Sequence, residues 1–297
     1  MLDIVANEND DDFANSPVDS NLPRRRLLNV LVVTVGFCLL FCAFNTLQAY
    51  VSSLLPGSLG FQSLVVLYVS YEVFLVVAPY LCDRLTDVGA LILGGTCYVV
   101  YIGSLITMNA VAIIFASIVI GFGAAILWVA QGSAITRWST DATRGKYAGI
   151  FWGGFQVSAV AGPLASYTIL STVSTDMEVT VLFAIFAAIA VASVLVFACH
   201  CCPCIRITPP KRRPTSTDGS AESCCKSIWA PVLRGLELCK TRDVALMLAA
   251  CVFTGVETTF SSGEYFKLVG LLPCDTFSDN ETAYVVFIAT HLCTCLL

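Results

Sequence analysis

Two carboxylates, Glu72 and Glu257, lie deep inside long apolar stretches of the sequence. A charged group held in hydrocarbon costs at least about 2.5 kcal/mol, so each carboxylate must be protonated, paired or turned toward water. A carboxyl in that situation can exchange a proton or bind a cation, which makes both residues candidates for coupling or for lining a cavity. For Glu72 the simpler alternative is a protonated carboxyl that bonds to a neighbouring helix.

Three amide side chains, Asn45, Gln48 and Gln131, also interrupt apolar stretches. Asn45 and Gln48 are three residues apart, so they lie on one face of a helix. Amides of this kind either line a polar cavity or form hydrogen bonds between helices, each worth under about 1 kcal/mol. For any single one of these residues we favour the interhelical hydrogen bond.

Gly145, Gly149 and Gly153 recur every four residues. Small residues at that spacing form one helical face, along which a second helix can approach closely. The stripe therefore predicts helix packing, either inside the protein, which we favour, or against a membrane partner. Gly162 and Pro163, later in the same stretch, are expected to bend or loosen the helix.

Four of the 15 cysteines, Cys199, Cys201, Cys202 and Cys204, cluster at the end of one apolar stretch. Cysteines beside a membrane helix are candidates for S-palmitoylation. A zinc site that includes His200 is the weaker alternative, because the spacing matches no standard site. The chain has two histidines, and no catalytic triad or carboxylate pair stands out. We therefore predict neither enzymatic activity nor a cofactor.

The elements that must position these residues are membrane-spanning helices. Hydrophobic residues make up 57% of the chain and charged residues 12%, about half the charge of a soluble domain. A helix of roughly 20 apolar residues crosses a bilayer, and the continuous apolar runs lack the alternation of a β-barrel. Seven stretches predict spans and an eighth begins one: 27–50, 62–82, 88–108, 110–135, 147–170, 179–199, 244–262 and 283–297.

Basic residues set the expected orientation, because they favour the cytoplasmic side of a membrane. A cytoplasmic N-terminus places 15 of the 16 Lys and Arg residues inside and leaves Lys267 outside. In that topology Asn280, in the sequon Asn280-Glu281-Thr282, lies in an outer loop where a glycan can be added. We expect an integral membrane protein in the plasma membrane rather than in endosomes, and no nucleic-acid partner.

The spans divide the chain into four parts. Residues 1–26 are an acidic tail that we expect to be disordered, and 27–202 form a six-helix half. A cytoplasmic linker, 203–243, precedes the start of a second half at 244–297. Six helices, a long inner loop and further helices are the layout of transporters built from two halves. We interpret the sequence as a truncated form or a fragment of such a protein.

Three segments carry a family resemblance: GFGAAILWVAQG at 121–132, RGKYAGIFWG at 144–153 and GVETTFSSG at 255–263. Together they resemble the uncoordinated-93-like family of the major facilitator superfamily. The resemblance implies an all-α bundle of twelve helices, of which the N-terminal six and the start of the second half are present here. Asp83 and Arg84 resemble the core of the superfamily's loop signature, although Pro79 replaces its leading glycine.

The resemblance implies a function as well as a fold. Family members include a regulatory subunit of two-pore-domain potassium channels and a chaperone of Toll-like receptors. We therefore predict an accessory protein that regulates or traffics a membrane partner such as a potassium channel. The alternative is a secondary transporter coupled through Glu257 or Glu72, and a further alternative is a truncated form with no activity of its own. By analogy, Asn45, Gln48, Gln131 and Glu257 would line one central pocket.

Overall fold

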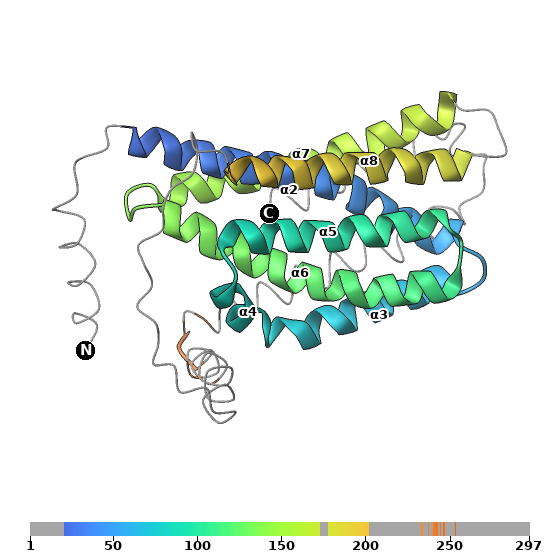
Figure 1. The fold of residues 1–297 in the computed structure, drawn as a ribbon, viewed down its shortest axis with the longest axis horizontal. Coiled ribbons are helices and arrows are strands. Elements are labelled where there is room, and N and C mark those ends of the chain that lie inside the picture. Colours follow the sequence, from blue (N-terminus) through green and yellow to red (C-terminus); the bar gives the residue numbers. More distant parts are fainter. Residues whose placement is uncertain are drawn as a thin grey trace.

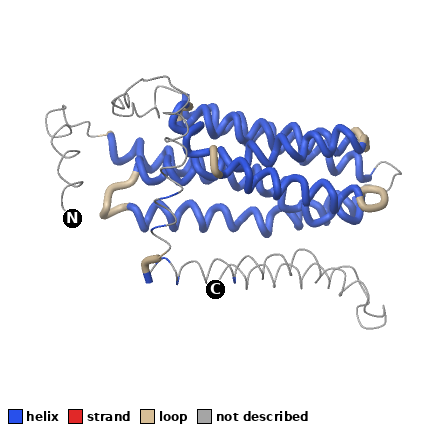
Figure 2. Tube along the Cα trace, turned by 90° about the horizontal axis from the view of Figure 1, so that it is seen from below, coloured by secondary structure: helices blue, strands red, loops and turns tan. Residues whose placement is uncertain are grey.

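The computed structural model describes residues 21–172 and 178–201, together with the isolated positions 233, 237, 240–242, 244, 246 and 253. Between residues 21 and 201 the described backbone is helical and contains no strand. The elements run along the bundle shown in Figures 1 and 2, and their bounds are α2 (Leu22–Leu54), α3 (Leu59–Leu75), α4 (Ala78–Arg84), α5 (Asp87–Ile106), α6 (Ala110–Trp138), α7 (Arg144–Thr172), α8 (Glu178–Ala198) and the 3₁₀ turn η1 (Cys199–Cys201).

Polar residues at the helix ends explain where two of these helices begin. The Thr86 hydroxyl accepts a hydrogen bond from the Gly89 N–H at 3.1 Å and caps α5. The Asn109 side chain accepts hydrogen bonds from the Val111 and Ala112 N–H groups and caps α6. Each cap satisfies backbone donors that have no partner inside the helix, which fixes the start of each span in the sequence.

Four helices, α2, α5, α6 and α8, contain segments long and apolar enough to cross a membrane, and the bent pair α3–α4 is a fifth crossing if it is one span. The expected span at 147–170 lies within α7, a helix of 29 residues. At 1.5 Å per residue α7 is about 43 Å long. Its glycines, serines and Gln156 make it more polar than the other spans, and it does not meet the same hydropathy criterion. The protein is thus an integral membrane protein by the composition of its helices.

The prediction of one continuous helix over 62–82 is wrong. The helix breaks between Leu75 and Ala78, where α3 and α4 meet at an angle of 65°. Pro79 lies in the first turn of α4. A proline ring clashes with the carbonyl group four residues earlier, which here belongs to Leu75, the last residue of α3. The break therefore follows from Pro79.

The helices form two three-helix units that pack in equivalent ways. In the first unit, α3 packs along α6 and α5 packs along α6; in the second, α7 packs along α2 and α8 packs along α2. Helices α5 and α8 pack against each other. Exchanging α2 with α6, α3 with α7 and α5 with α8 preserves this pattern. Because the two helices of each exchange are three crossings apart, they run in opposite directions, and the second unit is inverted relative to the first.

This packing leaves one side of the bundle uncovered by the described helices. On that side α3 packs on α6 and touches α2, and α7 packs on α2 and touches α6, while α5 packs against α8. We call this the open side. It exposes Tyr68 and Glu72 of α3 and Gly149 and Trp152 of α7.

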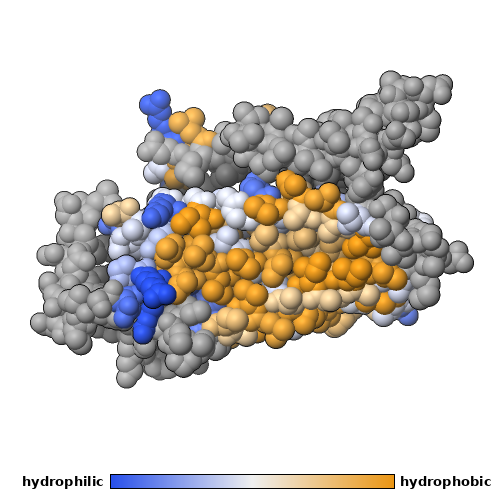
Figure 3. All heavy atoms as spheres, turned by 90° about the horizontal axis from the view of Figure 1, so that it is seen from above, coloured by the Kyte–Doolittle hydropathy of each residue, from blue (hydrophilic) through white to orange (hydrophobic). Residues whose placement is uncertain are grey.

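The surface of the bundle separates into an apolar band and a basic end. In Figure 3 apolar side chains cover the middle of the face in view, while strongly hydrophilic side chains gather at the left. Exposed apolar residues of α5 and α6 include Val100, Val111 and Phe115. At the basic end α2 begins and α6 ends, with Arg24, Arg25, Arg26, Arg137 and Arg144. A band of this kind suits hydrocarbon, and the charged end suits the headgroup region.

Candidate functional site

The polar side chains of α2 meet those of α3 on the open side. The Gln48 amide nitrogen donates a hydrogen bond of 2.7 Å to the Tyr68 hydroxyl. Asn45 is half-buried one turn earlier on the same face of α2. The structure places Asn45 and Gln48 on one face of α2, and it adds a tyrosine that the sequence interpretation did not include.

Glu72 lies next to this contact. It is exposed and lies four residues after Tyr68, so the two residues share a face of α3. Since α2 and α3 run in opposite directions, one turn from the Gln48–Tyr68 bond toward the basic end brings Asn45 and Glu72 to the same level. Tyr71 is half-buried one residue before Glu72. We call Asn45, Gln48, Tyr68, Tyr71 and Glu72 the α2–α3 polar site.

Gln131 does not join this site. The rings of Phe41 and Trp128, 5.3 Å apart, set α2 and α6 at one level. Asn45 is four residues from Phe41 away from the basic end, and Gln131 is three residues from Trp128 toward it. Seven residues at 1.5 Å each separate them by about 10 Å along the bundle. Gln131 is buried, and the fourth member of the predicted pocket, Glu257, lies outside the described residues.

An aromatic cluster lies between the level of Asn45 and the level of Gln131 along the bundle. Trp128 contacts Phe37 and Phe41 of α2, and it stacks on Trp152 of α7 with ring centroids 6.1 Å apart. Trp152 is half exposed on the open side. The two tryptophans lie in the two segments, 121–132 and 144–153, that carry the family resemblance, so the resemblance in these segments includes a direct α6–α7 contact.

The glycine stripe Gly145, Gly149 and Gly153 packs against no described helix. All three residues are exposed, and a Cβ atom added to any of them would meet no described atom within 4 Å. Helix α7 instead approaches α2 through Gly154 and Gly162, where an added Cβ would meet Thr34 and the backbone oxygen of Cys42. The role of the stripe in packing stays a prediction.

The residues that α7 does use share the same spacing. Gly154, Ser158, Gly162 and Ser166 recur every four residues, and both serines are buried. Sequence reasoning chose the first small-residue stripe of this helix and missed the second as its packing face. The period-four spacing of small residues is present in both stripes, so that signal alone does not separate a covered face from an open one.

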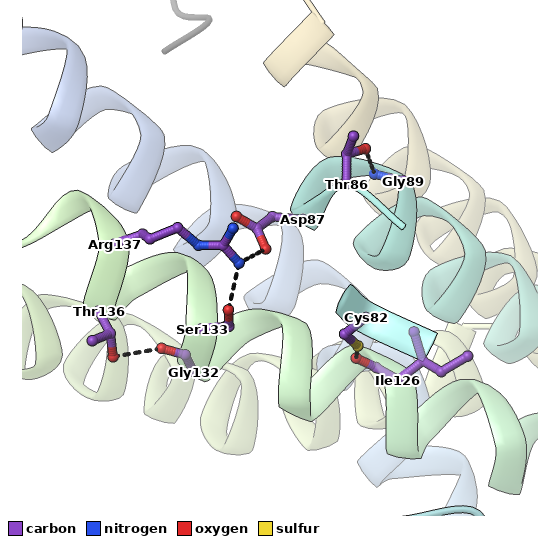
Figure 4. A network of polar contacts seen from close by, with 9 residues as sticks. All are labelled: Cys82, Thr86, Asp87, Gly89, Ile126, Gly132, Ser133, Thr136 and Arg137. Carbon is purple, nitrogen blue, oxygen red and sulfur yellow. Dashed lines mark hydrogen bonds and ion pairs between the residues drawn. The ribbon is translucent and has the colours of Figure 1, made fainter. Parts of the chain in front are cut away.

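An ion pair ties α5 to α6 at the basic end. Arg137 of α6 donates hydrogen bonds to the Asp87 carboxylate of α5 and to the Ser133 hydroxyl, as Figure 4 shows. The Asp87 side chain is 12% exposed and that of Arg137 35%. Asp87 lies in the first turn of α5 and Arg137 in the last turn of α6. Each charge therefore also complements the dipole of its own helix.

The loop signature expected around Asp83 and Arg84 takes a different form. Arg84 donates a hydrogen bond of 3.1 Å to the Tyr80 hydroxyl, and the carboxylate paired with Arg137 is Asp87, four residues beyond Asp83. The Cys82 thiol lies 3.5 Å from the Ile126 carbonyl oxygen and links α4 to α6 (Figure 4). Asp87 is the first residue of α5, so an acidic residue at the start of that helix was the signal available in the sequence.

His200 lies in η1 at the basic end, next to the last residue of α6. Its imidazole is buried, stacks on Trp138 and lies within hydrogen-bond distance of two backbone carbonyl oxygens, those of Phe197 at 3.0 Å and Asn29 at 3.2 Å. A neutral ring donates to one of them. Burial lowers the pKa of His200 below its ordinary value and outweighs the two carbonyl groups, which raise it.

This pKa shift predicts a loss of stability in acid. Because the folded protein holds His200 neutral more strongly than the unfolded chain does, unfolding takes up a proton. The stabilisation is complete above about pH 6.5, the unfolded pKa of histidine, and it falls as the pH drops below that value. We expect the unfolding temperature to fall between pH 7.5 and pH 5.5, and to fall less in His200→Gln. An equal pH response in both proteins would contradict the assignment.

The predicted modification sites lie mostly outside the part of the chain that the structure describes. Cys199 is exposed, and its thiol lies 3.4 Å from the Leu195 carbonyl oxygen. Cys201 lies in η1 without a described side chain, and Cys202, Cys204 and Asn280 lie outside the described residues. Among the described residues no group of three metal ligands is present. Palmitoylation and glycosylation stay predictions.

Comparisons with known proteins match the chain to UNC-93 proteins. A profile described as ion channel regulatory protein UNC-93 matches residues 33–287. The UNC93-like protein MFSD11 of Xenopus tropicalis is 31% identical over 268 residues, which cover 83% of this chain and 58% of that protein. Protein unc-93 homolog A of Homo sapiens is 29% identical over 288 residues, with 82% and 61% covered. The chain thus spans about three fifths of the length of these relatives.

The fold has a counterpart among solved structures. A crystal structure of the peptide transporter POT in complex with sulfate superposes with a TM-score of 0.53 at 16% identity. It covers 82% of this chain and 53% of the transporter. The helices therefore adopt the major facilitator fold. Since the family profile matches most of its length, this chain belongs to the UNC-93 family of ion channel regulatory proteins.

Proposed function

We propose that this chain is a non-enzymatic accessory protein that regulates or traffics a membrane partner, with a potassium channel as the first candidate. The observation that carries the proposal is the family match over residues 33–287. Two features of the bundle support it. A Cβ atom added to Gly145, Gly149 or Gly153 would meet no described atom within 4 Å, and Trp152 is half exposed beside this stripe. A glycine stripe lets the backbone of a second helix approach closely, so a partner helix can pack there.

The same proposal includes a placement in the membrane. The basic end, with Arg24, Arg25 and Arg26, lies on the cytoplasmic side together with the N-terminus. The plasma membrane is the proposed location. Residues 27–202 act as the six-helix half, 203–243 as the linker and 244–297 as the start of the second half. Asn280 is the proposed glycan acceptor.

Co-expression with a two-pore-domain potassium channel tests this function. We expect the channel to co-purify with the chain from detergent-solubilised membranes, and we expect the channel current or its surface level to change. Gly149→Leu should weaken both effects, because the new side chain fills the stripe. Gly103→Leu on α5 is the matched control, since an added Cβ there also meets no described atom. An unchanged current and unchanged location for every candidate channel would reject the proposal.

A secondary transporter is the second candidate, and one observation favours it. Glu72 is exposed on the open side at the level of Asn45, in a fold that a peptide transporter shares. Glu257 or Glu72 would then be the coupling group. Reconstituted chain would show solute uptake driven by a proton gradient, and that uptake would vanish in Glu257→Gln or in Glu72→Gln. Uptake insensitive to both substitutions would reject this role for the carboxylates.

A further inference from the structure

We propose that the α2–α3 polar site binds a small organic ammonium ion. The site contains Asn45, Gln48, Tyr68, Tyr71 and Glu72, and it is open to the outside of the described bundle on the open side. The proposal concerns a ligand of this chain and goes beyond the accessory role, because it requires neither a channel partner nor transport.

Register brings the polar groups of the site together. The hydrogen bond of 2.7 Å from Gln48 to Tyr68 joins α2 and α3 at one level. Asn45 is three residues from Gln48, and Glu72 is four residues from Tyr68, both toward the basic end. Residues three or four apart on a helix have Cβ atoms about 5–6 Å apart on one face. Amides and carboxylate therefore face the same short gap between the helices.

Several groups in this gap can contact a cation favourably. Glu72 supplies a carboxylate that forms no ion pair within the described part of the chain. The Gln48 nitrogen donates to Tyr68, so the Gln48 amide oxygen remains free to accept another hydrogen bond. The faces of Tyr68 and Tyr71 attract cations through the ring quadrupole. An ammonium group, which donates through N–H and carries a positive charge, complements all three.

No basic residue lies close to Glu72 in the sequence of α2 or α3. From residue 27 to residue 83, which includes nearly all of α2 and all of α3, the chain contains no Lys or Arg. A carboxylate in a span is costly unless it is protonated, paired or hydrated. A bound cation therefore supplies a positive charge that the chain does not supply between residues 27 and 83.

Depth separates the site from lipid headgroups at the end of α3 where Leu59 lies. Glu72 lies 13 residues after Leu59, the first residue of α3, which is about 20 Å along the helix. A lipid headgroup at the membrane surface beside Leu59 therefore lies too far away to reach Glu72. A short amine with an aromatic end fits the site, since its ring can pack on the two tyrosines while its ammonium group reaches Glu72.

Binding of 2-phenylethylammonium to the full chain in detergent or in nanodiscs tests the proposal. The neutral control is 2-phenylethanol, which has the same ring and chain with a hydroxyl in place of the ammonium. We expect the ammonium compound to bind at least about tenfold more tightly than the alcohol, because it adds a charge-assisted hydrogen bond and a cation–π contact. Equilibrium dialysis with radiolabelled compounds measures both affinities.

Variants separate the site from general partitioning into the micelle. Glu72→Gln should weaken ammonium binding by about tenfold and abolish the preference over the alcohol, while Glu72→Asp keeps the preference. Asp141→Asn, an exposed carboxylate of the basic end, should change nothing. Thermal unfolding shows that each variant is folded. Equal binding of ammonium and alcohol, or equal binding by the wild type and Glu72→Gln, would overturn the proposal, as would the absence of any binding.

Discussion

Gly121→Leu is expected to destabilise the bundle by about 3 kcal/mol or more. Helix α6 packs directly against the backbone of α3 at this residue. A Cβ atom added to Gly121 would lie 2.5 Å from the Ser70 Cβ, 2.7 Å from the Leu67 carbonyl oxygen and 2.8 Å from the Tyr71 nitrogen. Two of these atoms belong to the backbone of α3 and cannot rotate away. The gain in helix propensity from replacing glycine is at most about 1 kcal/mol. The clash therefore outweighs this gain, and the substitution destabilises the protein.

Gly103→Leu is the matched control for that prediction. It makes the same chemical change in a helix, yet an added Cβ at Gly103 meets no described atom within 4 Å. We expect its unfolding temperature in detergent to equal or slightly exceed that of the wild type. Fluorescence-detected size exclusion after heating compares the three proteins. Similar losses for both substitutions, or none for Gly121→Leu, would show that α3 and α6 do not pack closely at this residue.

Breaking the Asp87–Arg137 ion pair is expected to cost about 2 kcal/mol. Removing one partner of a fully buried pair costs about 3–5 kcal/mol, and the partial exposure of Arg137 reduces that value. Arg137→Gln leaves a nearly buried carboxylate without its charge partner, and Asp87→Asn does the same to the guanidinium. Thermal or denaturant unfolding in detergent measures the loss, which should shrink at high salt.

A double-mutant cycle isolates the pair itself. Asp87→Asn combined with Arg137→Gln should be more stable than the sum of the single losses, with a coupling of about 1–2 kcal/mol. The control is the ion pair between Arg144 and Asp141, whose side chains are both exposed. Asp141→Asn should leave the unfolding transition where it is, because exposed pairs contribute little. Strict additivity at Asp87 and Arg137 would mean that the two charges act independently.

The membrane helices were predictable from the sequence because hydropathy and length determine them. The predicted stretches 88–108 and 110–135 match α5 and α6 closely, with Thr86 and Asn109 as caps. The break at Pro79 was missed because 62–82 is uncharged apart from Glu72, and hydropathy does not report how a proline changes the backbone. The effect of Pro79 depends on backbone geometry, through the carbonyl group of Leu75.

The candidate site was predictable only in part. Asn45, Gln48 and Glu72 were singled out by their polarity, but their grouping depends on the register between α2 and α3, which the Gln48–Tyr68 bond reveals. Tyr68 was overlooked because a tyrosine in an apolar stretch adds little to a search for charges and amides. Gln131 was assigned to the same pocket by analogy, and the depth of α6 relative to α2 separates it. Sequence periodicity indicates which residues share a face of one helix. The relative depth of residues on two different helices depends on the contacts between those helices.

Photo-crosslinking at residue 149 tests the central claim most directly. A photoreactive amino acid placed at Gly149 in native membranes should form crosslinks to a second membrane protein, and the same probe at Gly103 should not. Mass spectrometry of the crosslinked product identifies the protein that contacts the stripe. Crosslinks from residue 149 only to lipid, or only within the same chain, would contradict an accessory role that depends on this face.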